Sequence, residues 1–531
     1  MTFRFGRRGR QAPGFLWIPA VAVGLLSLAP VYYLAVRSTE RGWEPWRDVA
    51  ERSLWPLLVD SLQLAVVVVM CSLAIALPGA WLTVRTDLPW RRAWAVALAL
   101  PLAIPSYVMG LAVVAALGPR GLLQDWLQPL GVERLPEIYG LPAATLTLTA
   151  VSYPYLYIVL RAALRAADPS IEEAARSLGA GRLRAFASVT LPALMPAIAA
   201  GSLLVALYAL SDFGGVATVR YTTFTRAVFL EYTSSFDRSR AAVLGVMLGV
   251  LAVTVLMLEL LARSRYQSRL RSARTAPSTP IPLGRWRWPA TGYLAIVVLV
   301  SEVLPVFVLC WWLGRGIAAG TDLPDVRGPL EHTLTLGLAG AAITTVLALA
   351  PAVLSARYGG FMARVVEQAT FIAHALPGLV IALALVFFGI AYARPLYQTT
   401  WMLLLAYVVL FVPNALAALR APLLRQDPHL EDAAASLGRR PFSTLATVTL
   451  PLARPGASAA FVLVFLTIVK ELPATLLLSP PGYRTLAGVT WSTSSEAFLG
   501  SAALPGLLII GLAALPAAVL AWRGDDESIE R

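Results

Sequence analysis

The sequence has few of the residues that enzyme sites, metal centres and disulfide frameworks require. It contains two cysteines and three histidines, and Lys470 is its single lysine among 531 residues. A phosphate-binding P-loop needs a lysine directly after a glycine-rich loop, and "TIVKELPATLLL" has no glycine before its lysine. The histidines are scattered at His332, His374 and His429 rather than paired as metal ligands or bases. We therefore expect no ATPase domain, no catalytic residue and no metal site in this chain.

Charged residues are also scarce, at 14% against 58% hydrophobic residues, and the mean hydropathy is +0.70. This composition excludes an ordinary soluble protein and predicts an all-α polytopic membrane protein, because each bilayer crossing takes roughly 20 apolar residues. Cys71 and Cys310 fall inside different apolar segments and are predicted to be buried free thiols. Twelve segments are candidate spans: 15–36, 57–84, 93–117, 141–164, 193–213, 241–262, 289–313, 331–356, 366–391, 399–419, 456–479 and 500–522.

Arginine supplies nearly all of the positive charge, and the formal net charge is +13. Arginines concentrate in the N-terminal segment, the 85–92 loop, the polar segment 171–197 and the stretch 263–288, whereas the intervening loops balance theirs with acids. The positive-inside rule therefore places both termini and these loops in the cytoplasm. Attraction to the membrane surface accounts for the basicity, so no nucleic-acid partner is expected. The first apolar run is too long for a signal peptide and is expected to remain as a span.

A basic, then proline-containing linker, residues 263–288, divides the chain into two homologous halves, 1–262 and 289–531, with six predicted spans each. "LAIPSYVMGLAV" in the first half parallels "HALPGLVIALAL" in the second. Both halves begin and end on the same predicted side, so they are parallel repeats of a kind known in transporters. We expect a transport pathway between the two halves.

The most informative repeat is polar rather than apolar. The segment 171–197, "IEEAARSLGAGRLRAFASVTLPALMPA", is matched 259 positions later by "LEDAAASLGRRPFSTLATVTLPLARPG". Each copy predicts a short helix, because Asp168 and Asp427 are suited to cap its start and Gly179 and Gly438 are suited to end it. A spaced duplication of this kind indicates two equivalent contact points.

Each short helix has a narrow apolar face, and the acids Glu172, Glu173 and Glu431 are predicted on the opposite face. One interpretation is an amphipathic helix that lies on the membrane surface. The other is a helix that docks into a cleft of another protein, which small alanines favour because they let a second backbone approach closely. The apolar positions are Ile171, Ala174, Ala175 and Leu178 in the first copy, and Leu430, Ala433, Ala434 and Leu437 in the second.

These residues resemble the cytoplasmic EAA loop of ABC-importer permeases, so residues 168–192 and 427–451 are called the first and second EAA loops below. The resemblance implies the type I permease fold and a coupling helix in each loop. It also implies two copies of a separate ATPase that uses ATP and Mg, an extracytoplasmic solute-binding protein, and no cofactor bound by this chain. The matching residues are Glu173, Ala174, Ala175, Gly179, Leu191 and Pro192 in the first loop, and Asp432, Ala433, Ala434, Gly438, Leu450 and Pro451 in the second, where aspartate replaces glutamate.

The resemblance extends over nearly the whole chain to the fused ferric-iron importer permeases of bacterial inner membranes. "SDFGGVATVRYTTFTRAVF" and "KELPATLLL" are similar to segments that follow the two EAA loops in that group. Thiamine importer permeases, or permeases for another small solute, remain the alternative. A twelve-span secondary transporter would also have two six-span halves, but the paired EAA loops and the absence of an obvious coupling-ion relay argue against it.

Two acids occupy corresponding places after the EAA loops, since Asp212 and Glu471 lie 259 positions apart. Ionisable groups in membrane segments are costly and often mark a transport path or an internal pair. One interpretation is that both acids line the outer mouth and meet a cationic cargo, because carboxylate oxygens suit a hard cation such as Fe(III). The other is that they fasten helices without touching cargo, with Lys470 as a candidate partner.

Overall fold

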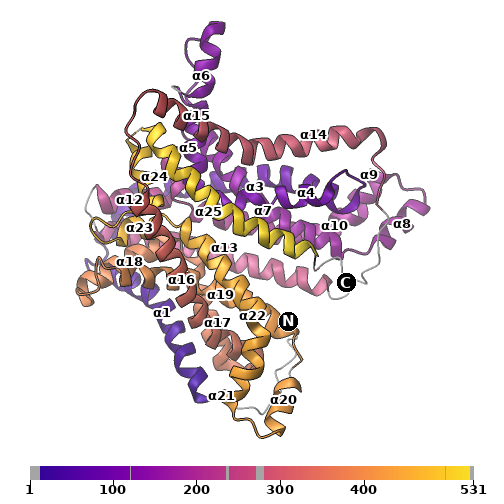
Figure 1. Ribbon diagram of the computed structural model, residues 1–531, viewed down its shortest axis with the longest axis vertical. Helices are drawn as coiled ribbons and strands as arrows, with labels where there is room; N and C mark the ends of the chain where they lie inside the picture. The colour runs from indigo at the N-terminus through magenta and orange to yellow at the C-terminus, as the bar shows by residue number, and fades with distance from the viewer. Residues whose placement is uncertain are drawn as a thin grey trace. The chain divides into compact units, whose positions relative to one another are not determined.

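The computed structural model describes residues 12–119, 121–234, 238–270, 280–427, 429–496 and 498–526, which form α-helices and no β-sheet (Figure 1). The N-terminal arginines, residues 271–279 of the linker and Pro428 lie outside these ranges. In chain order the helices are α1 (Gly14–Thr39), α2 (Glu44–Arg52), α3 (Leu54–Arg85), α4 (Arg91–Ala97), α5 (Ser106–Leu117), α6 (Leu122–Leu127), α7 (Leu141–Ala166), α8 (Pro169–Ser177), α9 (Arg182–Ala185), α10 (Leu191–Ser211), α11 (Gly214–Thr218), α12 (Phe224–Thr233), α13 (Arg238–Leu270), α14 (Arg287–Val298), α15 (Leu304–Ala318), α16 (Arg327–Val353), α17 (Gly360–Ala375), α18 (Gly378–Tyr392), α19 (Thr400–Arg425), α20 (His429–Ser436), α21 (Pro441–Thr444), α22 (Leu450–Val469), α23 (Pro473–Leu478), α24 (Leu486–Ser495) and α25 (Leu499–Asp526).

The chain forms two compact units, and each contains helices of both sequence halves. Unit 1 takes in the described residues of 1–51 together with 228–249 and 325–489. In it, α1 packs against α16, α17 and α18, and the Tyr33 hydroxyl donates to the Phe387 carbonyl at 3.2 Å. The first helix of the chain is therefore part of the unit that holds the second EAA loop.

Unit 2 takes in residues 52–227 and 250–324 and the described residues of 490–531. In it, α15 packs against α5 and α25, and the indole Nε1 of Trp312 donates to the Ala115 carbonyl at 3.0 Å. A helix from the start of the second sequence half therefore belongs to the unit that holds the first EAA loop.

The core of unit 2 is the packed group α3, α7 and α10. Glycine lets two of these helices approach closely, because a Cβ at Gly201 would lie only 2.5 Å from Cδ1 of Leu156. The buried Tyr157 hydroxyl lies 3.2 Å from Oγ1 of Thr83, which joins α7 to α3 by a hydrogen bond. These contacts set the end of α3 next to the first EAA loop.

The core of unit 1 is the equivalent group α16, α19 and α22. A Cβ at Gly456 would lie 2.5 Å from Cγ of Pro422, so glycine again permits close helix approach. The buried Tyr407 hydroxyl lies 2.7 Å from Oγ1 of Thr475 and joins α19 to α23. Both units thus hold a span that leads directly out of an EAA loop.

Eleven helical stretches among the described residues are long and apolar enough to cross a membrane, and Gly378–Tyr392 is a shorter apolar helix. Three predicted spans are interrupted, and one of them, 456–479, divides into α22 and α23. The segment 93–117 divides into α4, a 3₁₀ turn and α5, and the segment 366–391 divides into α17 and α18. Pro105 and Pro377 precede α5 and α18 directly, because proline cannot donate the backbone hydrogen bond that would continue the preceding helix.

The prediction of two buried thiols is wrong for Cys310, which is exposed on α15, while Cys71 is half-buried. In a membrane span, an apolar residue can face lipid as well as protein, so hydrophobicity alone does not predict burial within the protein.

Candidate functional site

The first EAA loop contains the predicted short helix, α8. The carboxylate oxygen Oδ1 of Asp168 accepts from the Ser170 amide at 2.9 Å and caps its start. The helix ends where Gly179 adopts a φ of +90°, and the Ala180 amide then donates to the Ala175 carbonyl at 3.1 Å. This is the glycine-dependent helix stop that the sequence predicts.

The second EAA loop repeats this geometry in α20. The His429 amide donates to Oδ1 of Asp427 at 2.9 Å. Gly438 has a φ of +80°, and the Arg439 amide donates to the Ala434 carbonyl at 3.1 Å. A Cβ on Gly438 would meet no atom within 4 Å, so its left-handed backbone is the reason for glycine there.

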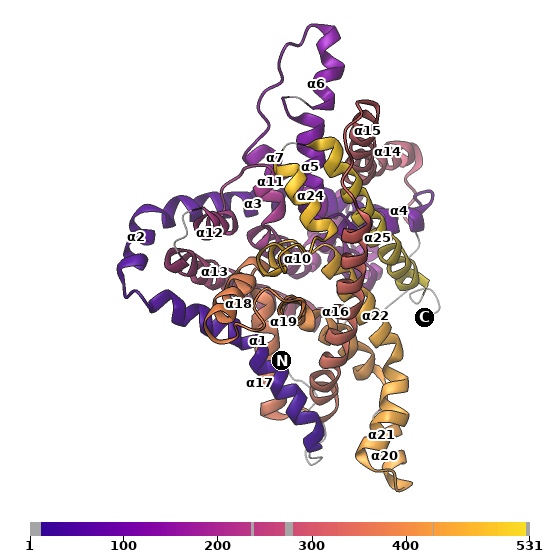
Figure 2. The ribbon, with the colours of Figure 1, turned by 60° about the vertical axis from the view of Figure 1, so that its left-hand side comes forward.

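Each loop joins its span through a π-helical turn, at Phe186–Thr190 in the first loop and Leu445–Thr449 in the second. The Leu191 amide donates to the Phe186 carbonyl, and the Leu450 amide donates equivalently to Leu445. Pro192 and Pro451, the next residues, lack the N–H that a regular α-helical bond needs at this point. The Leu-Pro pairs of the EAA pattern thus sit where the turn becomes α10 and α22, and Figure 2 shows α20 and α21 beyond the end of α22.

The predicted docking face is solvent-exposed at its leucines and partly covered at its alanines. The side chains of Leu178 and Leu437 are 89% and 83% exposed, and Ile171 and Leu430 are also exposed. Exposed apolar side chains grouped on a loop mark a contact surface. The other residues of the two short helices and their stops that match the EAA pattern differ in exposure. Those that are exposed are Glu173, Ala174, Gly179, Ala433 and Gly438, those that are half-buried are Ala175 and Asp432, and Ala434 is buried.

The first glutamate of each loop turns inward instead of lying with its neighbour on the outer face. Thr190 donates its hydroxyl to Oε2 of Glu172 at 2.6 Å, and Thr449 donates to Oε1 of Glu431 at 2.8 Å. These bonds tie the short helix to the π-helical turn that begins the span. The sequence prediction missed this role, although an available signal was the same Glu-to-Thr spacing in both copies.

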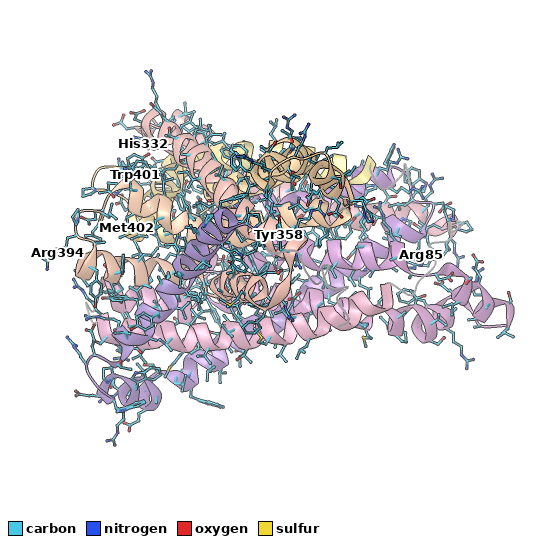
Figure 3. The ribbon with its side chains drawn as sticks, turned by 90° about the horizontal axis from the view of Figure 1, so that it is seen from below. Arg85, His332, Tyr358, Arg394, Trp401 and Met402 are labelled. Atoms are coloured by element: carbon cyan, nitrogen blue, oxygen red, sulfur yellow. The ribbon has the colours of Figure 1, made fainter. Side chains whose placement is uncertain are left out.

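An arginine at the end of an earlier helix of the same unit holds each loop at its start. Arg85, labelled in Figure 3, donates from Nη2 to the Ala167 carbonyl at 3.0 Å, and Arg357 donates from Nη1 to the Gln426 carbonyl at 3.3 Å. Ala167 and Gln426 are equivalent positions, 259 residues apart. The ends of α3 and of the turn after α16 are thereby fixed to the loops.

The second loop has an additional buried ion pair. Nε of Arg357 lies 2.9 Å from Oε1 of Glu431, and the two side chains are 6% and 9% exposed. Removing one partner of a buried ion pair strongly destabilises the folded protein, because the other charge stays buried without compensation. The second loop is also contacted by α1, since the rings of Phe15 and Phe442 pack edge to face at 5.7 Å.

The two outer acids cap short helices in their own units. Oδ1 of Asp212 accepts from the amides of Gly215 at 2.8 Å and Val216 at 3.3 Å, which caps α11. Oε1 of Glu471 accepts from the Ala474 amide at 3.1 Å at the start of α23. These contacts favour the interpretation that the two acids fasten helices. Lys470, the candidate partner named from the sequence, lies at the C-terminal end of α22, directly before Glu471. Among the described residues, no group of three or more His, Cys, Asp or Glu side chains could hold a metal ion.

Comparison with known proteins identifies the repeated unit. The family profile described as "Binding-protein-dependent transport system inner membrane component" matches residues 73–268 and again 345–522, and each match contains one EAA loop. The chain is 31% identical to the Fe(3+)-transport system permease protein FbpB 2 of Haemophilus influenzae, over 96% of this chain and 98% of that protein. It is 33% identical to the molybdenum transport system permease protein ModB of Escherichia coli, over 31% of this chain and 71% of that protein. It is 28% identical to the sulfate transport system permease protein CysW of Synechocystis, over 45% and 88%.

Replacing Thr449 by valine is expected to lower the free energy of unfolding by about 1–3 kcal/mol, since the isosteric change leaves the buried Glu431 without one donor. Thr190→Val should cost less, because Glu172 is only half-buried. Thermal unfolding of the purified chain measures both. Thr254→Val is the matched control, because Thr254 is exposed and donates only within its own helix. Equal stability of the Thr449 and Thr254 variants would contradict the assignment.

Proposed function

This chain belongs to the family of binding-protein-dependent transport system inner membrane components, and on that premise we propose that it is the fused permease of an ABC importer for ferric iron. The observation that carries the proposal is the pair of EAA loops, each capped, stopped and tied to its own span in the same way. Iron is favoured as the cargo because the alignment with the ferric relative covers almost the full length of both proteins. The alignments with the molybdenum and sulfate relatives cover only part of this chain.

The permease takes no covalent part in catalysis and acts as conduit and lever. Two copies of a separate ATPase, which use ATP and Mg, dock on the exposed apolar faces of α8 and α20. When ATP binding draws the ATPase subunits together, the Glu172–Thr190 and Glu431–Thr449 bonds make each π-helical turn follow its loop. The movement reaches α10 and α22 as rigid spans, so the pathway opens alternately to the two sides.

The cargo arrives from an extracytoplasmic solute-binding protein on the side opposite the EAA loops. Labelled ferric iron, thiamine, molybdate and sulfate offered to cells that carry the complete importer distinguish the candidate cargoes. We expect uptake of iron alone. Uptake of another solute would refute the iron assignment and leave the permease role intact, whereas uptake that needs no ATPase would refute the permease role.

Leu437→Asp is expected to abolish copurification of the ATPase and reduce iron uptake at least tenfold, because a charge at a desolvated contact is costly. Leu178→Asp should act in the same direction. Leu130→Asp is the control, since Leu130 is equally an exposed leucine, 76% accessible, but lies in the loop after α6. Membrane insertion should stay normal in all three variants. Full ATPase retention by the Leu437 variant would remove the docking assignment.

The arginine distribution predicts that both termini and both EAA loops are cytoplasmic. In a chain whose Cys71 and Cys310 are changed to alanine, a cysteine at Ser177 should resist a membrane-impermeant maleimide applied to intact cells. A cysteine at Thr321, exposed between α15 and α16, should react. The reverse labelling pattern would contradict this topology and would place the EAA loops on the side opposite the cytoplasm, where the ATPase could not dock.

A further inference from the structure

A hollow of about 430 Å³ opens in unit 2 at the turn between α3 and α4, and the proposed transport mechanism makes no use of it. It lies in the 85–92 loop, which the arginine distribution predicts to be cytoplasmic. Figures 1 and 2 both show α4 close to α14, the helix that follows the linker. The residues that line it are Asp87, Leu88, Trp90, Arg91, Arg92 and Pro280.

The end of the linker forms one wall of this hollow. The Ile281 amide donates to the Arg85 carbonyl at 2.8 Å, and the Asp87 amide donates back to the Ile281 carbonyl at 3.2 Å. The Leu283 amide then donates to Oδ1 of Asp87 at 2.9 Å. The single acid of the hollow is therefore engaged by the linker backbone, and the linker is held against the turn.

Trp90 has a backbone conformation that large side chains rarely adopt. Its φ is +54°, in the left-handed region, and its side chain is 68% exposed. Left-handed backbone costs a bulky residue on the order of 1 kcal/mol, and such residues gather at functional sites. The equivalent turn of the second repeat has Gly359 and Gly360 at positive φ, where no such cost arises. Trp90 therefore carries backbone strain that glycine would relieve, and its indole lies exposed beside the hollow.

The hollow has a net positive charge, because two arginines and one aspartate line it. Arg91 and Arg92 are exposed, and neither forms an ion pair with any residue in the described part of the chain. Just beyond the linker wall, Trp286 and Trp288 are exposed and alternate with arginines in "GRWRWP". Exposed indoles beside arginines are typical of the membrane interface, where the ring lies at headgroup level and the cation meets phosphate.

We propose that this hollow binds the headgroup of an anionic glycerophospholipid, with Arg91 and Arg92 at the phosphate and the Trp90 ring against the glycerol region. The lipid joins the α3–α4 turn to the linker, and so connects the two sequence repeats on the membrane surface. The site is specific to the first repeat. The position equivalent to Arg92 is Arg364, 272 residues later, where Ala363 replaces the neighbouring arginine.

The test is native mass spectrometry of the purified full-length chain titrated with phosphatidylglycerol. The Arg91→Gln, Arg92→Gln double variant should bind the most tightly retained lipid about thirtyfold more weakly than the natural chain, from two arginines near an anionic headgroup. Arg364→Gln is the matched control and should bind it unchanged. Phosphatidylcholine should be retained no better by the natural chain than by the double variant.

Two more variants separate binding from folding. Arg91→Lys with Arg92→Lys keeps the charge and should retain most of the affinity. Trp90→Gly should raise thermal stability in neutral detergent, because it relieves the left-handed strain, and yet weaken lipid binding. Unchanged affinity in the double glutamine variant, or an equal loss in Arg364→Gln, would overturn the proposal. Displacement of the lipid by inorganic phosphate at equal concentration would overturn it in favour of a soluble anion.

Discussion

The hydrogen bond between the first glutamate of each EAA loop and the threonine of its π-helical turn is the contact on which the proposed coupling depends. It ties α8 and α20 directly to the π-helical turns from which α10 and α22 continue. With it, a displacement at the docking face must also displace the start of α10 or α22. Because proline follows each turn, the turn ends where the regular span begins, and the loop and the span share one continuous backbone.

The two loops are alike in design and unequal in attachment. The second loop adds the buried Arg357–Glu431 pair and the edge-to-face contact of Phe442 with Phe15. Removing either partner of a buried ion pair strongly destabilises the fold, so this pair fixes the second loop against the turn after α16. The first loop depends on Asp168, Thr190 and the arginine contact at Ala167.

The exchange of helices between the sequence repeats gives the units a composition that neither half of the chain could supply alone. Unit 1 uses α1 to cover α16, α17 and α18, and unit 2 uses α15 to cover α5. Since apolar helices gain little by burial from lipid, close packing and specific hydrogen bonds decide which helices associate. Tyr33 with the Phe387 carbonyl and Trp312 with the Ala115 carbonyl are bonds of this kind.

The sequence by itself determined the membrane class, the two repeats and the start and stop of each EAA helix, because hydropathy, Asp168 capping and the left-handed preference of Gly179 are local properties. Only the tertiary structure decided that Glu172 turns inward while Glu173 stays exposed. The two acids are adjacent in one turn of helix, and the group that separates them, Thr190, lies 18 residues further along the chain. Only the tertiary structure also brought Arg357 to Glu431, because the two residues lie 74 positions apart in the sequence. It likewise decided the exposure of Cys310, since the hydrophobicity of a span does not show whether a residue faces a neighbouring helix or lipid.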